Sequence, residues 1–238
     1  HIDTGKKFKE MYCFRDKYVK KWNLNLIKGF CPYIDKIDSS LPPAARSAAR
    51  KTEGLRKMIK KKKFRGIIAG IRRDEQGTRA KERIFSPRSD SGTWDIKNQP
   101  PEFWDQSNFN YPKSVHIRIH PLLGWTEIDI WEYIKKEKIN ISELYFAKNR
   151  PTVKRNGLFF MVDDERFRLK KNEIPKKRKI RFRTLGCYPL TASIESEAQT
   201  IDQVINETMI LKKSERNGRL IDKDETSTLE IKKRQGYF

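Results

Sequence analysis

The spacing of apolar side chains predicts four helices separated by short strands. In residues 3–22 and 126–138 the apolar side chains recur every three to four positions, as on one face of a helix. Residues 44–60 are rich in alanine and straight-chain side chains, which favour helix formation. Residues 64–69 and 115–119 are instead short β-branched or alternating runs. The expected elements are helices at 3–22, 44–60, 126–138 and 195–212, strands at 24–27, 64–69, 115–119 and 159–162, and loops at 30–43 and 86–112.

Short strands that alternate with helices of this length indicate an α/β fold with a parallel sheet. The strand at residues 64–69 is expected to be buried, because it is β-branched and flanked by glycines. In parallel sheets, ligands bind beyond the carboxyl ends of the strands. Two charged segments occupy that kind of position, "HIDTG" at residues 1–5 and "GIRRDEQGTRAKER" at residues 70–83.

The composition is that of a globular chain. Of its 238 residues 36% are hydrophobic, and five Trp, thirteen Phe and eight Tyr supply a core. No apolar run approaches the roughly 18 residues that a membrane span needs. Cys13, Cys31 and Cys187 lie far apart and form no CxxC pair, so neither a disulfide framework nor a zinc site is expected. These features favour a reducing, cytoplasmic compartment.

The charge is strongly basic, with a formal net charge of +22 and a pI of about 9.9. Such a balance predicts attraction to polyanions such as nucleic acid or phosphates, or to an acidic partner. The alternative is that the lysines only cover solvent-exposed faces. The basic runs at residues 60–63 and 176–179 favour this alternative. Charge alone therefore leaves the kind of partner open.

Residues 70–83 carry five basic and three acidic side chains in fourteen positions. Gly70 would let the backbone leave the preceding strand at an unusual angle. One interpretation is a polyanion clamp, since a planar guanidinium binds two phosphate or sulfate oxygens at once. The other is a surface helix with ion pairs such as Glu75 with Arg79, and the position at a strand end favours the clamp. The candidate cations are Arg72, Arg73, Arg79, Lys81 and Arg83, with Asp74 and Glu75 orienting them or binding magnesium.

The "HIDTG" segment, residues 1–5, has the form of a turn between a strand and a helix. Asp3 or Thr4 would accept hydrogen bonds from free amide groups at the helix start. The same side chains could instead contact a nucleotide, and the two roles are compatible.

Other polar and aromatic residues are expected to be structural. His116 and His120 lie in a strand without carboxylate or cysteine neighbours at ligand spacing, so they do not predict a metal site. Cys187, in "LGCYPL", is expected to be a small buried residue. The aromatic residues of the 86–112 loop are expected to anchor that loop rather than stack on bases. They are Trp94, Phe103 and Trp104.

Six segments spread over the chain resemble sulfate adenylyltransferase subunit 2, the small, ATP-binding subunit family of the heterodimeric bacterial ATP sulfurylase. They are "HIDTGKKFKEMYCFRD", "RRDEQGTRAKERIFSPR", "WDIKNQPPEFW", "PLLGWTEIDIWEYI", "RFRTLGCYPLTASIESEA" and "SERNGRLIDKDETSTLEIKKRQGYF". The fourth is shared with phosphoadenylylsulfate reductases. The second and the last are far more specific to the sulfurylase subunit.

The resemblance implies a three-layer, Rossmann-like adenine-nucleotide alpha-hydrolase (PP-loop) fold over residues 1–190. Residues 191–238 would be a C-terminal helix and a polar tail that docks a partner or covers the active site. It also implies the reaction of ATP with sulfate to give adenylyl sulfate and pyrophosphate, with Mg²⁺ bound to ATP. The partner would be a large GTPase subunit whose GTP hydrolysis drives this unfavourable adenylation. No membrane is implied, and nucleic acid is not an expected partner.

The resemblance also assigns roles to residues. Positioning and charge neutralisation are the main needs of such a transfer. The candidate catalytic residues are therefore Arg72, Arg73, Asp74, Glu75, Arg79, Lys81 and Arg83. The candidates for nucleotide contact are His1, Asp3, Thr4, Gly5 and Gly70, and those for phosphate or partner contact are Arg216, Arg219 and Asp222.

One departure from the family pattern affects activity. Members carry a Ser-Gly-Gly-Lys-Asp-Ser-like loop upstream of the "HIDTG" equivalent, whose backbone amides hold pyrophosphate. None of the 12 glycines lies in such a motif, so the first strand, the loop and the first helix of the fold are expected to be missing. The 238 residues alone are therefore expected to bind ATP poorly and not to turn over.

Three other functions are alternatives to this one. A phosphoadenylylsulfate reductase would need a cysteine in a C-terminal Glu-Cys-Gly-x-His motif, and no cysteine follows Cys187. A basic nucleic-acid-binding module would show a helix-turn-helix, RRM or zinc signature, and none is recognisable. The third is a scaffold that keeps only a surface for docking the GTPase subunit.

Overall fold

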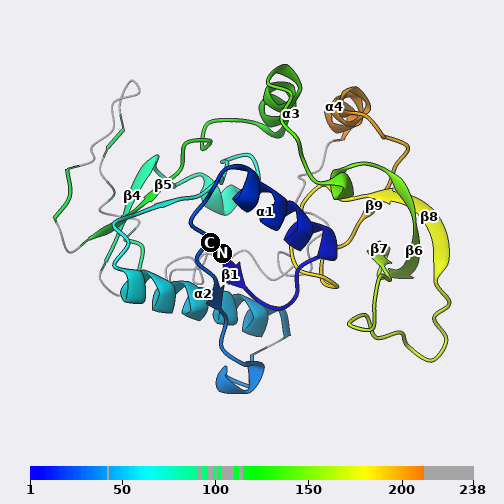
Figure 1. The fold of residues 1–238 in the computed structure, drawn as a ribbon, viewed down its shortest axis with the longest axis horizontal. Helices are drawn as coiled ribbons and strands as arrows, with labels where there is room; N and C mark the ends of the chain where they lie inside the picture. Colours follow the sequence, from blue (N-terminus) through cyan, green and yellow to red (C-terminus); the bar gives the residue numbers. More distant parts are fainter. Residues whose placement is uncertain are drawn as a thin grey trace. The chain divides into compact units, whose positions relative to one another are not determined.

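The computed structural model describes residues 1–41, 43–89, 93–95, 99, 101–102, 110–112 and 115–211. Figure 1 shows the helices and strands along the chain. The helices are α1 (Lys9–Lys21), α2 (Pro43–Lys62), α3 (Glu127–Lys136) and α4 (Ile201–Ile210), with short 3-10 turns η1 (Ile34–Lys36), η2 (Gly77–Arg79) and η3 (Glu143–Tyr145). The strands are β1 (Ile2–Asp3), β2 (Gly29–Phe30), β3 (Gly66–Ile68), β4 (Phe85–Arg88), β5 (His116–Ile119), β6 (Lys148–Arg155), β7 (Leu158–Met161), β8 (Lys176–Arg181) and β9 (Ile194–Glu195).

The chain divides into two compact units. The first consists of His1, Asp3–Lys28 and the described residues from Glu127 onward, and the second of Ile2 and Gly29–Thr126. The expected domains, residues 1–190 and 191–238, divide the chain differently. In the structure α4 belongs to the same unit as α3.

The first unit is built on an antiparallel sheet in the order β7-β6-β8-β9. Its apolar side chains form a core with Phe8, which precedes α1, and with Tyr188 from the loop after β8. Phe8 meets Phe182 and Tyr188 edge to face, with ring centroids 4.8 Å and 5.6 Å apart. The expectation of a parallel sheet is wrong for this unit, because tight reversals such as the one at Gly157 join neighbouring strands directly.

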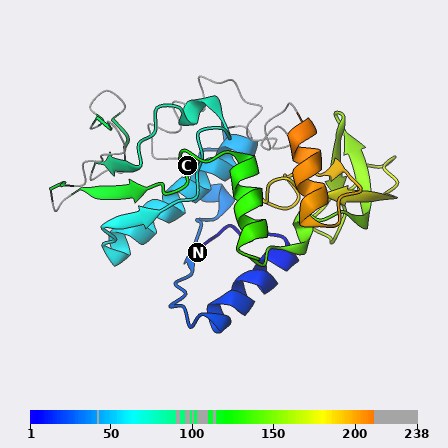
Figure 2. The same cartoon turned by 90° about the horizontal axis from the view of Figure 1, so that it is seen from above.

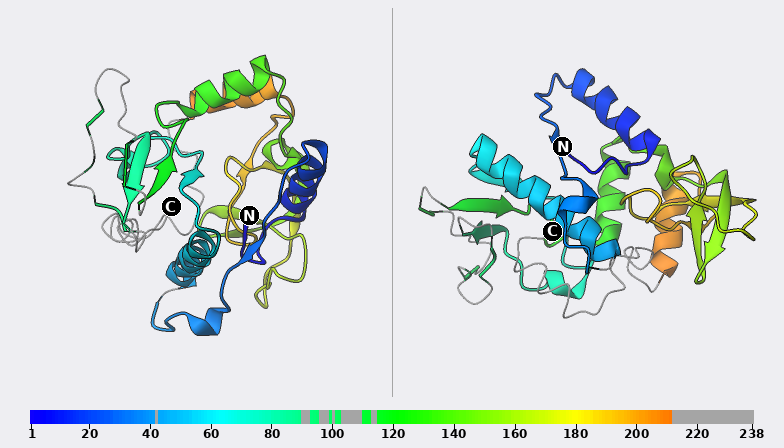
Figure 3. Two further views of the ribbon diagram at one scale, coloured as in Figure 1. Left: turned by 60° about the vertical axis from the view of Figure 1, so that its left-hand side comes forward. Right: turned by 90° about the horizontal axis from the view of Figure 1, so that it is seen from below.

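Helices α3 and α4 lie side by side in the first unit, as Figures 2 and 3 show. Trp131 of α3 packs with Val204 and Ile205 of α4 in a second apolar cluster. The fully buried Arg181 of β8 holds α4 to the sheet through Glu207, at 2.7 Å and 2.9 Å. A charged group is therefore part of the structural frame of this unit.

The second unit holds a three-stranded sheet in the order β3-β5-β4. β3 and β5 are parallel, whereas β4 and β5 are antiparallel. The strand expected at residues 64–69 is present as β3, but it is not buried, and Ile68 is 74% exposed. β3 is exposed because it lies at the edge of the described sheet. Flanking glycines and β-branched residues predict a strand, but they do not distinguish an edge strand from a central one.

Two glycines allow close packing around β1, β2 and α2. β1 and β2 pair in a two-stranded sheet. A Cβ on Gly29 would lie 2.5 Å from Cε of Met58, and one on Gly54 would lie 3.3 Å from the backbone of Cys31. A side chain at position 29 would make the end of the Met58 side chain move, and one at position 54 would lie tightly against the backbone of Cys31.

Several expected boundaries are wrong. α1 begins at Lys9 rather than near Asp3, because Phe8 still has an extended backbone (φ −63°, ψ 146°). The strand expected at 24–27 is absent from that range, and β2 follows it instead. β4 begins at Phe85 and takes up the first residues of the expected 86–112 loop. α4 begins at Ile201, where the side chains of Thr200 and Gln203 cap it reciprocally. The strand at 115–119, the strand at 159–162 and the helices at 44–60 and 126–138 are confirmed as β5, β7, α2 and α3 within about two residues at each end.

The described helices all lack the combination of length and apolar character that a membrane crossing requires. The tail from residue 214 onward, and with it Arg216, Arg219 and Asp222, lies outside the described residues, as do Phe103 and Trp104. Trp94 is described and is buried, as expected of a residue that anchors a loop.

Candidate functional site

The Asp-Thr-Gly segment forms a tight turn in the first unit. The Asp3 carboxylate accepts hydrogen bonds from Gly5 N–H (2.8 Å) and the Tyr12 hydroxyl (2.7 Å), and Thr4 Oγ1 accepts from Lys6 N–H (3.2 Å). Burial and the hydrogen bond to Asp3 raise the pKa of Tyr12 to about 12, so its hydroxyl keeps its proton. Gly5 has a φ of +68°, which explains the glycine.

These hydrogen bonds correct the expectation that Asp3 or Thr4 caps a helix. Both side chains bind amide groups of their own turn, and α1 begins only at Lys9. His1 lies beside this turn, with its ring 6.3 Å from that of Tyr12. The turn is therefore stabilised by its own side chains and does not depend on a helix start.

The turn is anchored to the loop around Tyr188. Tyr188 N–H donates to Lys6 O at 2.7 Å, and Cys187 Sγ lies 3.7 Å from Thr4 Oγ1. The Arg166 guanidinium donates to Lys7 O at 2.9 Å. Cys187 is buried, as its sequence context predicts. The "LGCYPL" segment thus holds the Asp-Thr-Gly turn in place.

In the second unit, the first half of the charged segment is internally paired. The backbone N–H of Arg72 donates to Glu75 Oε1 at 3.0 Å, and Arg72 Nε donates to Asp74 Oδ1 at 2.9 Å. The alternative interpretation of this segment, a surface helix with ion pairs such as Glu75 with Arg79, is wrong, because the segment forms a loop with the short turn η2. Asp74 and Glu75 therefore orient Arg72, one of the two roles predicted for them.

The second half of the segment turns inward. Arg79 and Glu82 are buried, whereas Arg73 and Lys81 are exposed. The Arg73 guanidinium donates to Glu82 O at 3.2 Å. Arg83 is half-buried, and its carbonyl oxygen lies 2.8 Å from His120 Nδ1.

Strands β4 and β5 place further polar side chains on one face of their sheet. Ser86 lies opposite Arg118, and Arg88 lies opposite His116. Residues directly opposite each other in a sheet point to the same face, and all four are buried. Treating residues 86–112 as loop hides this group. The alternation of polar with apolar residues in "FSPR" and "HIRI" is the signal that could have identified it.

Glu82 connects the charged segment to this face. Its carboxylate lies 3.4 Å from the Arg88 guanidinium and accepts a hydrogen bond from Ser86 Oγ at 3.2 Å. Arg88 also lies 5.3 Å from the centre of the Trp94 ring, within cation–π distance. We call Arg79, Glu82, Arg88 and Arg118 the buried arginine cluster.

Burial sets the protonation states around the buried arginine cluster. It lowers the pKa of Arg118 to about 9, with Arg88 and Arg79 adding to the effect and Glu82 opposing it, so the guanidinium is charged at pH 7. Burial also lowers the pKa of both His116 and His120 to about 4. Both imidazoles are therefore neutral at pH 7.

The buried arginine cluster is suited to an anion. It holds three buried guanidinium groups and one carboxylate, and an anion beside buried guanidinium groups offsets part of their mutual repulsion. Within the described part of the chain, the buried atoms Arg88 Nε and His116 Nε2 have no hydrogen-bond partner. A sulfate or phosphate group offers acceptors to such donors.

Two further expectations can be compared with the geometry. Gly70 does not have a positive φ, and a Cβ there would lie 3.9 Å from Leu122 Cδ1. The expectation that Gly70 is needed for an unusual backbone angle after the strand is therefore wrong. Among the described residues no group of three or more His, Cys, Asp or Glu side chains is arranged to hold a metal ion. His116 and His120 serve as buried neutral groups instead.

The chain is similar to proteins of one enzyme family. Residues 1–193 match the model of the phosphoadenosine phosphosulfate reductase domain. The chain is 47% identical over 243 aligned residues to sulfate adenylyltransferase subunit 2 of Serratia proteamaculans, and 48% identical to that of Buchnera aphidicola. In both cases the alignment covers 100% of this chain and 80% of the relative.

Among solved structures, the chain is similar to FMN adenylyltransferase of Candida glabrata, with a TM-score of 0.43 and 16% identity over 80% of this chain and 43% of that one. The family assignment rests on the sequence matches. The chain belongs to the phosphoadenosine phosphosulfate reductase domain family and, within it, to the sulfate adenylyltransferase subunit 2 proteins.

Proposed function

We propose that the protein is the ATP-binding subunit of an enzyme that converts ATP and sulfate into adenylyl sulfate and pyrophosphate. The observation that carries this proposal is the identity of 47–48% to sulfate adenylyltransferase subunit 2 proteins along the whole chain. The fold proposed with it is the three-layer, Rossmann-like PP-loop fold. The described parallel pair β3–β5 is compatible with a sheet of that kind.

The reaction needs charge neutralisation more than proton transfer. A sulfate oxygen forms a bond to the α-phosphorus of ATP, while the bond from that phosphorus to the oxygen bridging to the β-phosphorus breaks. Its electron pair leaves with pyrophosphate. Sulfate is fully ionised at pH 7, so no base is required. With pKa values of about 4, His116 and His120 are weak bases, which is consistent with a reaction that needs no base.

We assign the anion contacts to the buried arginine cluster. Two polyanions that repel each other can approach only where fixed positive charge offsets the repulsion. The guanidinium groups of Arg79, Arg88 and Arg118 are buried, so their field is screened little by water. Glu82 fixes Arg88, and Arg72 shapes the loop that leads to Arg79.

The remaining predicted residues take supporting roles in the proposal. Arg73 and Lys81 are exposed and would meet the outer phosphates, while Arg83 orients His120 through its carbonyl oxygen. The contact of Asp3, Thr4 and Gly5 with the nucleotide stays a prediction for the first unit, where these residues form a tight turn with His1 beside it. Gly70 needs no special role in this assignment.

Mg²⁺ would arrive with the phosphates of ATP. The Asp74 carboxylate is engaged by Arg72 Nε, and Glu75 accepts from the Arg72 N–H, so both already have an orienting role. The partner that we propose is the large GTPase subunit, in the cytoplasm. The name of the relatives, subunit 2, supports a partner subunit.

The test is sulfate-dependent release of pyrophosphate from ATP by this chain joined to the glycine-rich loop segment that the family pattern places before it, in the presence of the GTPase subunit and GTP. Arg88→Lys and Arg118→Lys keep the charge but lose the planar fork, so we expect each to lower kcat/KM for sulfate by about a hundredfold. Arg65→Lys is the matched control, since Arg65 is exposed in the same unit and its guanidinium donates to the carbonyl oxygen of Pro112. Wild-type rates in both cluster variants would refute the assignment of sulfate to this cluster.

A further inference from the structure

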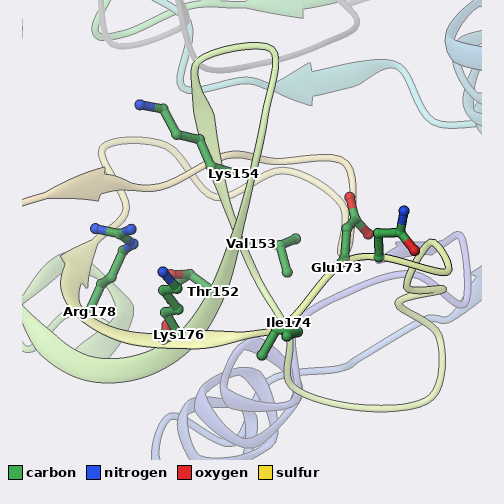
Figure 4. A pocket seen from close by; sticks show the side chains of 8 residues that line it. Thr152, Val153, Lys154, Glu173, Ile174, Lys176 and Arg178 are labelled. Atoms are coloured by element: carbon green, nitrogen blue, oxygen red, sulfur yellow. The ribbon is translucent and has the colours of Figure 1, made fainter.

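A pocket of about 260 Å³ lies in the first unit, at the end of the β6–β8 strand pair (Figure 4). β8 pairs with β6 only as far as Lys176, opposite Thr152, whereas β6 runs on to Arg155. Residues 172–174 form the opposite wall, so the pocket opens where the two strands part. The lining residues are Thr152, Val153, Lys154, Asn172, Glu173, Ile174, Lys176 and Arg178.

Hydrogen bonds hold the two walls of this pocket in place. The Arg155 guanidinium donates to both oxygens of Glu173, at 2.7 Å and 2.6 Å, and Lys170 N–H adds a third donor at 2.8 Å. The hydrogen bonds from Arg155, and to a smaller extent the one from Lys170, lower the pKa of Glu173 to about 2. On the other wall, Thr152 Oγ1 donates to Lys176 O at 3.1 Å. The pocket is therefore formed before anything binds.

The pocket carries uncompensated positive charge. Neither Lys154 nor Lys176 has an ion pair with any described carboxylate. Arg178 donates to Glu195 at 2.8 Å, but both side chains of that pair reach solvent. The Glu173 carboxylate is already engaged by Arg155, so it does not neutralise the two lysines. Figure 4 shows Lys176 and Arg178 on the side opposite to Glu173.

An apolar contact lies next to this charge. Ile174 is 79% exposed at the rim, whereas Val153 is buried beside it. The nearby Phe159 ring is covered, since Lys154 Nζ lies 5.4 Å and the Arg178 guanidinium 4.9 Å from its centre. A ligand would therefore meet cations and one exposed aliphatic side chain, but no open aromatic face.

We propose that this pocket docks an acidic segment of the partner subunit, with a carboxylate between Lys154 and Lys176 and an apolar side chain against Ile174. This inference rests on the proposed two-subunit enzyme and identifies the surface that receives the second subunit. A free inorganic anion would leave Ile174 without a contact. Single-stranded nucleic acid would need a stacking surface, and the Phe159 ring is already covered.

The experiment measures binding of this chain to the GTPase subunit by sedimentation or interferometry, at low and high salt. In the double variant Lys154→Glu and Lys176→Glu we expect the Kd at low salt to rise by at least about tenfold, because two attractions become repulsions. The effect should shrink at high salt. Ile174→Ser should weaken binding at both salt concentrations, because it removes the apolar contact and no charge.

The matched control is Lys171→Glu with Lys177→Glu. It makes the same charge change at exposed positions that do not line the pocket, and Lys177 points to the other face of β8 from Lys176. We expect the Kd to change less than about threefold in the control. Circular dichroism and thermal unfolding of each variant separate a docking effect from misfolding.

Two outcomes would overturn the proposal. Equal weakening in the pocket variant and the control would mean general attraction by the basic surface. Unchanged partner affinity, together with loss of binding to a random RNA oligomer, would mean that the pocket serves nucleic acid. Binding is measured without turnover, so an inactive wild-type complex would count against the proposed function and not against this docking site.

Discussion

Gly5 and Gly70 both follow strands, but only Gly5 needs to be glycine. Gly5 has a φ of +68°, in the left-handed region, whereas Gly70 is outside it and has room for a Cβ 3.9 Å from Leu122. We expect Gly5→Ala to lower the free energy of unfolding by about 1 kcal/mol and Gly70→Ala to change it by less than about 0.5 kcal/mol. Urea unfolding measures both.

Gly5→Asn is the control for this comparison, because asparagine tolerates a positive φ better than alanine does. It should lose less stability than Gly5→Ala. Since no heavy atom outside the neighbouring residues lies within 4 Å of a Cβ at Gly5, the cost comes from the backbone and not from a clash. Equal losses in the two Gly5 variants would contradict that explanation.

The buried histidines predict a loss of stability in mild acid. The pKa of His116 and of His120 is about 4 in the folded protein, against about 6.5 when unfolded. Between these values the unfolded chain binds protons that the folded chain does not. The free energy of unfolding should therefore fall as the pH falls from about 7 towards about 4, by up to about 3 kcal/mol per histidine.

Urea unfolding at several pH values above about 4.5 tests this prediction. The carboxyl groups of Asp164 and Glu173, with pKa values lowered to about 2, begin to lose their stabilising effect near about pH 5, so the slope between pH 7 and pH 5 belongs mainly to the histidines. His116→Gln should remove about half of the slope, since His120 remains. A wild-type free energy of unfolding that stays flat between pH 7 and pH 5 would contradict the neutral, buried state of both imidazoles.

At the scale of the elements, the sequence pattern predicted those helices and strands that depend mainly on interactions between residues close together in the chain. α2 and α3 were predictable because apolar periodicity and helix-favouring residues extend along them. The start of α1 was not, because Asp3 and Thr4 resemble helix caps but bind the amides of their own turn. β4 was hidden because "FSPR" contains proline and serine, and it exists through its pairing with β5.

The antiparallel sheet of the first unit shows the same limit. β7 was predictable as an apolar run, but β6 and β8 are rich in lysine and arginine and do not read as strands. They form because each pairs along its length with a neighbour and contributes side chains such as Ile180 and Val153 to the core. Pairing between strands far apart in the sequence leaves no local pattern.

The beginning of α4 offers a test at this scale. Thr200 Oγ1 accepts from Gln203 N–H at 3.3 Å, and the Gln203 side chain accepts from Thr200 N–H at 3.2 Å. Thr200→Ala should therefore lower the free energy of unfolding by about 1 kcal/mol. Thr52→Ala is the matched control, because Thr52 lies inside α2 and bonds Ala48 O, where alanine is a better helix former. A cost in the control as large as that in Thr200→Ala would contradict a specific capping role.

At the scale of the whole molecule, the basic charge serves different purposes in the two units. The lysines of residues 60–63 are exposed at the end of α2, as expected of a solvated face. The guanidinium groups of Arg79, Arg88 and Arg118 are buried in the second unit, whereas Lys154 and Lys176 line an open pocket in the first. A net charge of +22 predicted binding to polyanions or to an acidic partner. Which basic residues are buried and which are exposed can be known only from the structure.

This difference between the units predicts where sulfate acts on the molecule. Sulfate stabilises compact states of proteins in general, so a rise in Tm alone would not identify a site. Specific binding at the buried arginine cluster should instead add hydrogen-exchange protection to β4 and β5, while β8 gains no more than the rest of the chain. Sodium chloride at equal ionic strength is the salt control, and Arg118→Lys should abolish the added protection. Protection that rises equally in β5 and β8 would show that sulfate acts only as a stabilising salt, and the cluster would then lose its assignment as the anion site.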